Sequence, residues 1–160
     1  PKFDYIQGRI FSFFNRETGS HNFQSDKAID SITSGGFFGK GIGEGTLKNR
    51  VPEAHTDYII SVISEEFGVV AIMLILLLFL IFIYMVFKKI RFENDDMIKL
   101  ILIGSISLIL MQATIHIGVN IRLLPTTGMT LPFLSYGGSS IVSTSILAGI
   151  ILNLTKRNIN

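Results

Sequence analysis

The 160-residue sequence contains no cysteine and carries few charged side chains. The absence of cysteine excludes disulfide frameworks, thiol nucleophiles and cysteine-based metal sites, and it leaves the redox compartment unreadable. Charged residues make up 16% of the chain, against 48% for hydrophobic residues, and the mean hydropathy is +0.51. That balance is too apolar for a soluble domain of this length and indicates a membrane protein.

An excess of positive charge is also lacking, because the formal net charge is only +2. Nucleic-acid binding is therefore not expected, particularly since the basic residues gather at the ends of apolar runs, where they act as topology signals. The chain begins with Pro1 and shows no cleavable signal peptide. We expect it to be a piece of a longer protein.

Three apolar runs follow the first third of the chain. The first, Phe67 to Phe87, has 21 residues, which at about 1.5 Å each match a hydrocarbon core of about 30 Å. The second, Leu100 to Ile121, contains polar side chains that should face protein: Ser105, Ser107, Gln112, Thr114, His116 and Asn120. The third has prolines and glycines in its first half, so only residues 139–155 are expected to be helical.

These runs predict an all-α polytopic membrane protein with three transmembrane helices, preceded by a large extracytoplasmic loop with short amphipathic helices. Basic residues lie between the first two spans and after the third, and such flanks are normally cytoplasmic. The expected segments are an extracytoplasmic loop at 1–57, a helix at 58–88, a cytoplasmic loop at 89–97, a helix at 98–120, an extracytoplasmic loop at 121–138, a helix at 139–155 and a cytoplasmic tail at 156–160.

The loop at 1–57 contains two predicted short helices and a glycine-rich stretch. Ile6, Ile10 and Phe13 fall at helical spacing, and residues 24–32 favour a second helix. The stretch at 35–45 is not a Walker phosphate loop, because Gly41 occupies the Ser/Thr position, and no strand precedes it as a dinucleotide fingerprint requires. A flexible or re-entrant backbone beside a cavity is expected instead.

A polar hexapeptide, residues 52–57, stands immediately before the first span. Its ionisable side chains Glu53, His55 and Asp57 lie at the expected bilayer edge, where charge is costly and usually functional. The alternative is that Asp57 or Thr56 caps the following helix, and the residues alone support both readings about equally. Glu65 and Glu66, which follow, are expected to cap the membrane edge or to pair with basic loop residues.

A second motif segment, residues 124–140, is rich in proline, glycine and hydroxyl side chains. Non-helical backbone at membrane depth is tolerated only where protein or a water-filled cavity satisfies it. A cleft between this segment and Asp57 would meet that condition. The residues expected to line it are Pro125, Gly128, Ser135, Gly137, Gly138 and Ser139.

The two segments together resemble the SEDS family (shape, elongation, division and sporulation). The resemblance rests on PEAHTD at 52–57, EEFG at 65–68, LPTTG at 124–128 and PFLSYGGSS at 132–140, in that order, with the glycine loop ahead of them. It extends from about residue 5 to about residue 155 and is closer to the division member than to the elongation member. Two residues depart from it: His116 stands where the family usually has Asn, and Arg122 where it has a small residue, often Gly.

The resemblance implies the carboxy-terminal portion of a ten-helix fold in the bacterial inner (cytoplasmic) membrane, at the division septum. It implies a peptidoglycan glycosyltransferase that polymerises lipid II, surrounded by membrane lipid and working with a class B penicillin-binding transpeptidase and other division proteins. The family's catalytic Asp corresponds to Asp57. Glu53, His55 and Thr56 would lie in the substrate cleft without being catalysts.

Lipid II polymerisation gives an independent reason for an acid at this position. A sugar 4-hydroxyl must attack an anomeric carbon while a lipid diphosphate leaves, and a carboxylate can accept the hydroxyl proton. By analogy with inverting glycoside chemistry, no covalent glycosyl intermediate is needed. Lys48, Arg50 and Arg122 are candidate cations for the leaving group. No cofactor is assigned; a divalent cation recruited with the diphosphate is the one candidate, although no metal-ligand spacing is visible.

Two other function classes stay open. A lipid II flippase is one, because broken helices and polar residues in a membrane can define a transport path. A non-catalytic division scaffold that recruits a transpeptidase is the other. For His116, packing or a hydrogen bond to Gln112 one turn away is favoured over a catalytic role.

Overall fold

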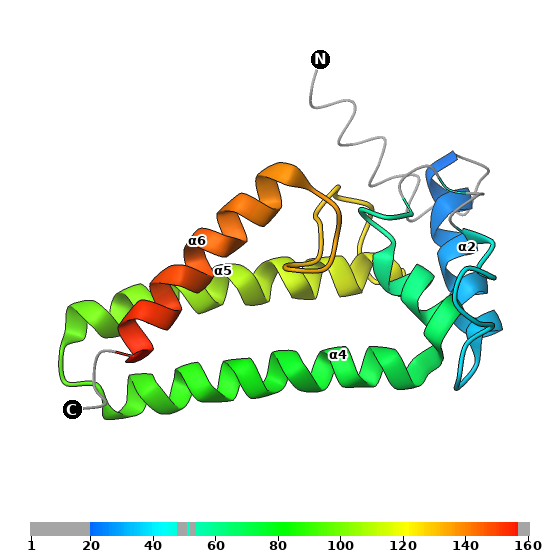
Figure 1. Ribbon diagram of the computed structural model, residues 1–160. Helices are drawn as coiled ribbons and strands as arrows, with labels where there is room; N and C mark the ends of the chain where they lie inside the picture. The colour runs from blue at the N-terminus through cyan, green and yellow to red at the C-terminus, as the bar shows by residue number, and fades with distance from the viewer. Residues whose placement is uncertain (1–19, 48–50, 52–53, 157–160) are drawn as a thin grey trace, which may run out of the picture.

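The computed structural model describes residues 20–47, 51 and 54–156, and within these residues all regular structure is helical. The helices are α2 (Ser20–Gly35), α4 (Ile59–Phe92), α5 (Asp96–Asn120) and α6 (Gly138–Lys156) (Figure 1). The last three are long and apolar enough to cross a membrane, which confirms the three predicted spans. Helix α2 is longer than the predicted 24–32, and the helix predicted around Ile6 lies outside the described residues.

Helix α5 is the central element of the arrangement. α4 and α5 run side by side in opposite directions, α6 packs at an angle on α5, and α2 lies across the end at which α4 begins (Figure 1). One apolar cluster joins Val86 of α4, Ile106 of α5 and Ile151 of α6. A second, at the opposite end of α5, joins Ala28 of α2 to Tyr58 and Val119. Both ends of α5 are therefore packed against other elements.

The connection between α4 and α5 explains where each helix ends. Lys89, in the last turn of α4, forms an ion pair with Glu93 at 3.1 Å, and this hydrogen-bonded ammonium lowers the pKa of the Glu93 carboxyl. Asp95 then caps α5, because its side chain accepts a hydrogen bond from the Met97 backbone N–H at 2.9 Å. The expected cytoplasmic location of this end stays a prediction, since no membrane is present.

Helix α4 is broken at Gly68, where φ is +80° and ψ is −178°. Such a conformation is open to glycine and strained for other residues. The break separates the first turns, from Ile59, from the long apolar part of the helix. It also removes helical hydrogen bonds beside the apolar part of the helix, and unpaired backbone groups are expensive in apolar surroundings.

The glycine-rich loop supplies the missing partners. Its carbonyls accept hydrogen bonds from backbone N–H groups just after the break, and its N–H groups donate to carbonyls just before it. The four bonds are Val69 N to Gly36 O (3.0 Å), Val70 N to Phe37 O (3.3 Å), Lys40 N to Glu65 O (2.8 Å) and Gly41 N to Glu66 O (3.1 Å). The loop is thus docked on the helix break by backbone hydrogen bonds. The sequence suggested only a flexible or re-entrant backbone beside a cavity.

The polar side chains of α5 follow the prediction in part. His116 and Asn120 have no exposed surface, and Ser105 is buried. Ser107 and Thr114 are exposed on the outer side of this chain. The prediction that they all face protein therefore holds within this chain only for the side chains that point toward α4 and the two motif segments.

We expect Gly68→Ala to unfold the protein more easily. An added Cβ would lie 2.2 Å from the Phe37 carbonyl oxygen, and the positive φ adds strain of its own, for a combined cost of about 2–5 kcal/mol. Thermal unfolding in detergent measures the change. The matched control is Gly104→Ala in α5, whose Cβ would meet nothing within 4 Å and which should be neutral or stabilising by up to about 1 kcal/mol. Equal effects of the two changes would contradict this account of the break.

Candidate active site

The turn at 54–58 carries the described part of the polar hexapeptide, and apolar packing anchors both of its ends. Ala54 has no exposed surface and Tyr58 is 1% exposed. Both pack with Leu47 and Val62, while the Tyr58 hydroxyl lies 3.3 Å from the Ser25 hydroxyl of α2. Burial raises the pKa of the Tyr58 phenol. Between these anchors, His55 is exposed and Thr56 and Asp57 are half-buried.

Helix α5 holds the backbone of this turn from one side. Asn120 donates from its side-chain amide to the Asp57 carbonyl oxygen at 2.9 Å. The same side chain accepts hydrogen bonds from the Ser61 backbone N–H at 3.2 Å and from the Ser61 hydroxyl at 2.8 Å. His116 Nε2 lies 3.3 Å from the Thr56 carbonyl oxygen. Two successive carbonyls of the motif are thus bonded to α5.

The second motif segment holds the same turn as well. The Ser135 hydroxyl donates to the Thr56 carbonyl at 2.8 Å and accepts from the Leu131 backbone N–H at 2.8 Å. The Tyr136 backbone N–H donates to the His55 carbonyl at 3.2 Å. The expectation that the two motif segments meet is therefore correct, and the Ser135 hydroxyl connects them.

Gly128 is a residue of the second motif segment that lies close to the predicted catalytic acid. A Cβ placed on Gly128 would lie 4.0 Å from Asp57 Oδ2, and its φ of +71° favours glycine. The backbone of the second motif segment therefore passes close to the Asp57 carboxylate.

Asp57 is not the N-cap of α4. That position belongs to Tyr58, which makes no side-chain capping hydrogen bond. The Ser61 N–H, one of the donors that a cap normally satisfies, is bonded instead by Asn120 from α5. The N-cap of α4 is therefore one residue later than capping by Asp57 would require, and the role of the Asp57 side chain stays a prediction.

The other predicted site residues are spread over several locations. Pro125 and Gly137 are half-buried, and Gly138 and Ser139 are exposed at the start of α6. Their substrate-binding role stays a prediction. Glu53, Lys48 and Arg50 lie outside the described residues.

Arg122 follows α5 with φ of +59°, in the left-handed region that favours glycine. This conformation gives a physical reason for the small residue that the family resemblance expects at this position. The guanidinium is paired with Asp26 of α2. Arg122 therefore ties α2 to the end of α5, and its predicted role at a diphosphate stays a prediction.

Glu65 lies at the centre of a separate polar network beside the glycine loop. Its carboxylate, 1% exposed, accepts from Lys40 Nζ at 2.9 Å, from the Thr46 hydroxyl at 3.0 Å and from the Leu47 backbone N–H at 2.9 Å. Pairing of Glu65 with a basic loop residue was expected. The network ties the end of the glycine loop to the first part of α4.

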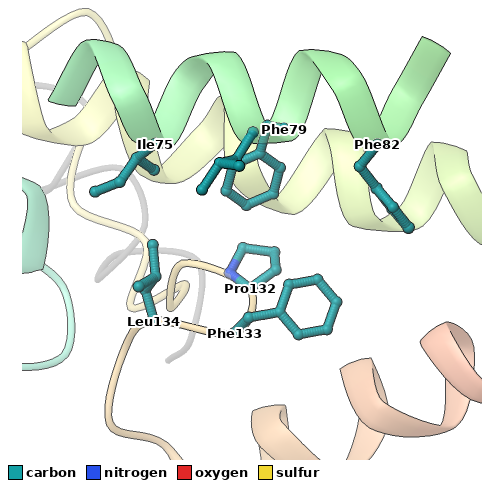
Figure 2. Close-up of a pocket in the computed structure, with 7 residues that line it drawn as sticks. Ile75, Phe79, Phe82, Pro132, Phe133 and Leu134 are labelled. Atoms are coloured by element: carbon teal, nitrogen blue, oxygen red, sulfur yellow. The ribbon is translucent and has the colours of Figure 1, made fainter. Parts of the chain in front are cut away.

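An apolar cavity of about 300 Å³ lies between α4 and the second motif segment. Figure 2 shows Ile75, Phe79 and Phe82 on one side and Pro132, Phe133 and Leu134 on the other. No lining residue is ionisable. The cavity is therefore no centre for proton transfer, although Leu134 precedes Ser135 in the chain.

The sequence predicted that Asn120 faces protein, but not that it bonds the turn at 54–58 and Ser61, and it expected Gln112 to bond His116. Gln112 donates to the Thr130 carbonyl and to the Ser140 hydroxyl, each at 2.9 Å, whereas His116 lies 3.4 Å from the amide of Asn120, one turn further on. The spacing of four residues between Gln112, His116 and Asn120 was the available signal. Among the described residues, no group of three potential ligands could hold a metal ion.

Comparison with known proteins places this arrangement in a family. The family model for FtsW, RodA and SpoVE, described as "Cell cycle protein", matches residues 2–160. The chain belongs to this family. The SEDS resemblance of the motifs is thereby confirmed, and with it the interpretation of the chain as the carboxy-terminal part of a larger helical fold.

Several relatives in the FtsW, RodA and SpoVE family bear the name "Probable peptidoglycan glycosyltransferase FtsW". The protein of Caulobacter vibrioides is 37% identical over 97% of this chain and 40% of its own length. That of Enterococcus hirae is 37% identical over 98% of this chain and 40% of its own length. That of Francisella salina is 39% identical over 96% and 40%. The chain therefore spans about two fifths of these curated relatives.

A solved structure shares the fold. It is described as "Structural coordination of polymerization and crosslinking by a peptidoglycan synthase complex". The TM-score is 0.75 at 24% sequence identity, and the match covers 98% of this chain and 43% of that one. The described helices thus have the arrangement found in part of a larger, experimentally determined protein.

We expect Glu65→Gln to destabilise the docked loop by about 1–3 kcal/mol. The change removes the charge that attracts Lys40. It also replaces a carboxylate that accepts from three donors, one of them a buried backbone N–H, by an amide with a single acceptor oxygen. The free energy of unfolding measures the loss. Glu44→Gln is the matched control, because Glu44 is exposed, and it should leave stability within about 0.5 kcal/mol of the wild type. A Glu65 variant as stable as this control would show that the network is dispensable.

Arg122→Gly and Arg122→Ala should differ in stability. Glycine relieves about 1–2 kcal/mol of left-handed strain while losing a surface ion pair worth about 0–1 kcal/mol, so it should be neutral or slightly stabilising. Alanine keeps the strain and loses the pair, so it should be less stable than both glycine and wild type. Thermal unfolding of the three proteins side by side tests this order. A glycine variant less stable than the alanine variant would contradict it.

Proposed function

We propose that this chain is the carboxy-terminal part of a peptidoglycan glycosyltransferase that polymerises lipid II at the division septum, with Asp57 as the general base. The observation that carries the proposal is the approach of the second motif segment to the Asp57 carboxylate at Gly128. The names of the relatives support the reaction class. The related peptidoglycan synthase complex, which is described as coordinating polymerisation and crosslinking, supports a class B penicillin-binding transpeptidase as partner.

The proposed step is a single displacement. The 4-hydroxyl oxygen of one lipid II attacks the anomeric carbon of another sugar, so that a new C–O bond forms as the bond from that carbon to the lipid diphosphate oxygen breaks. The hydroxyl proton passes to the Asp57 carboxylate, and the diphosphate leaves with the bonding electron pair. A positively charged group must stabilise that leaving group, and Lys48 and Arg50 are the candidates closest to Asp57 in the sequence.

The close approach of Gly128 to Asp57 supports a role as general base rather than a purely electrostatic role for the carboxylate. A general base must come within about 2.6–3.2 Å of the proton that it abstracts, which requires open space at the carboxylate. A side chain at residue 128 would lie against the carboxylate, because even its Cβ would be 4.0 Å from Asp57 Oδ2, so glycine keeps this side of Asp57 less crowded.

Asp57→Asn should reduce lipid II polymerisation by at least about 100-fold, because the amide cannot accept the proton and general-base catalysis contributes about 10²–10⁴. The measurement is glycan chain formation by the intact protein with its transpeptidase partner, at matched abundance in the membrane. Asp96→Asn is the control, since Asp96 lies at the opposite end of α5 and pairs with Lys99. It should polymerise like the wild type.

Each contrary result points to a different function. Full polymerisation by the Asp57→Asn variant would remove the base from Asp57. Transfer of lipid II across the bilayer without chain growth, in both wild type and variant, would favour a transporter. Unchanged partner recruitment with no polymerisation in any protein would favour a scaffold.

A further inference from the structure

We propose that Asn120 and His116 of α5 are positioning residues, which set the direction of the Asp57 carboxylate by holding the backbone of its turn. The inference rests on the proposed function of Asp57 and adds two residues to it. Both side chains act through the carbonyl groups of residues 56 and 57.

Asn120 couples the turn to the start of α4. Its amide donates to the Asp57 carbonyl while its oxygen accepts from both polar groups of Ser61. One planar side chain, with no exposed surface, therefore fixes the turn before α4 and the first turn of α4 relative to each other.

His116 fixes the preceding carbonyl. Because the Thr56 carbonyl can only accept, the contact at 3.3 Å requires a proton on Nε2. The Asn120 amide also donates to the His116 backbone carbonyl at 2.9 Å, and it lies 3.4 Å from Nδ1, which is unprotonated when the ring is neutral. His116 and Asn120 thus form one buried hydrogen-bonded unit, and the Ser135 hydroxyl shares the Thr56 carbonyl with it.

Holding two successive carbonyls restricts rotation of the peptide units on either side of the Asp57 Cα atom. The direction of the Cα–Cβ bond, and hence the region that the carboxylate can reach, follows from these units. Misplacement of a reacting group by about 1 Å can cost about 100-fold in rate. Loss of the Asn120 amide should therefore slow the reaction without removing the base.

The first test compares Asn120→Ala with the wild type in the intact protein. We expect kcat for lipid II polymerisation, per folded molecule, to fall about 10- to 100-fold while KM stays within about twofold. In parallel, hydrogen exchange of the backbone amides at 54–61 should become faster. Asn94→Ala, which alters an exposed asparagine between α4 and α5, is the control and should change neither quantity.

Two variants of His116 distinguish loss of the hydrogen-bond donor from misfolding. His116→Gln keeps a donor that can reach the Thr56 carbonyl and should retain most of kcat, whereas His116→Leu keeps the bulk without the donor and should lose it. If Asn120→Ala and His116→Leu keep the wild-type kcat per folded molecule, the two residues only stabilise the fold and the inference is wrong. Unchanged exchange at 54–61 would also overturn it.

The two proposals fail in distinguishable ways. Loss of polymerisation in Asp57→Asn together with normal kcat in Asn120→Ala would leave the base in place and remove the positioning residues. Activity in Asp57→Asn would remove the base. The exchange rates at 54–61 would then still show whether α5 holds the turn, because they do not depend on turnover.

Discussion

The break of α4 at Gly68 is the constraint on which the rest of the structure depends. A continuous helix would direct the residues before Gly68 along the axis of the long apolar part of α4. The break instead turns the first part of α4, from Ile59, toward α2 and the end of α5 (Figure 1). It also exposes backbone groups that must be paired, and the glycine-rich loop pairs them. Helix direction and loop position therefore follow from the same residue.

Two polar networks on the first turns of α4 hold the segments beside that helix, the end of the glycine-rich loop in one network and the turn at 54–58 in the other. Glu65 holds Lys40, Thr46 and the Leu47 backbone in one network. Asn120 holds Ser61 and the Asp57 carbonyl in the other. Because buried polar groups are costly when unpaired, each network favours a single arrangement. At the candidate active site, hydrogen bonds thus hold the backbone of the turn at 54–58, and this backbone carries Asp57, the one predicted catalytic side chain.

The sequence predicted the elements whose signal is local. Apolar length identified the three spanning helices, and the proline, glycine and hydroxyl pattern of residues 124–140 identified an irregular segment that meets the hexapeptide. The break at Gly68 was not predicted, because a single glycine in an apolar run is compatible with a straight helix. The groups that pair with the broken backbone belong to the docked loop, about thirty residues earlier in the chain. The pairing of Asn120 with Asp57 and of Arg122 with Asp26 is likewise set by tertiary contacts that no periodicity records.

For the polar residues of α5, the sequence predicted correctly which side of the helix faces protein but not which groups these residues bond. Gln112, His116 and Asn120 recur every four residues, so they lie along one side of the helix. Each bonds a different part of the opposing surface: Gln112 the Thr130 carbonyl and Ser140, His116 the Thr56 carbonyl, and Asn120 the Asp57 carbonyl and Ser61. In an apolar surrounding, a row of such side chains is stable only if every one finds a partner. Helix α5 therefore contacts both motif segments at intervals of one helical turn. A shift of either segment by one turn would leave buried donors unpaired, which is a physical reason for the two segments to keep their register at the candidate site.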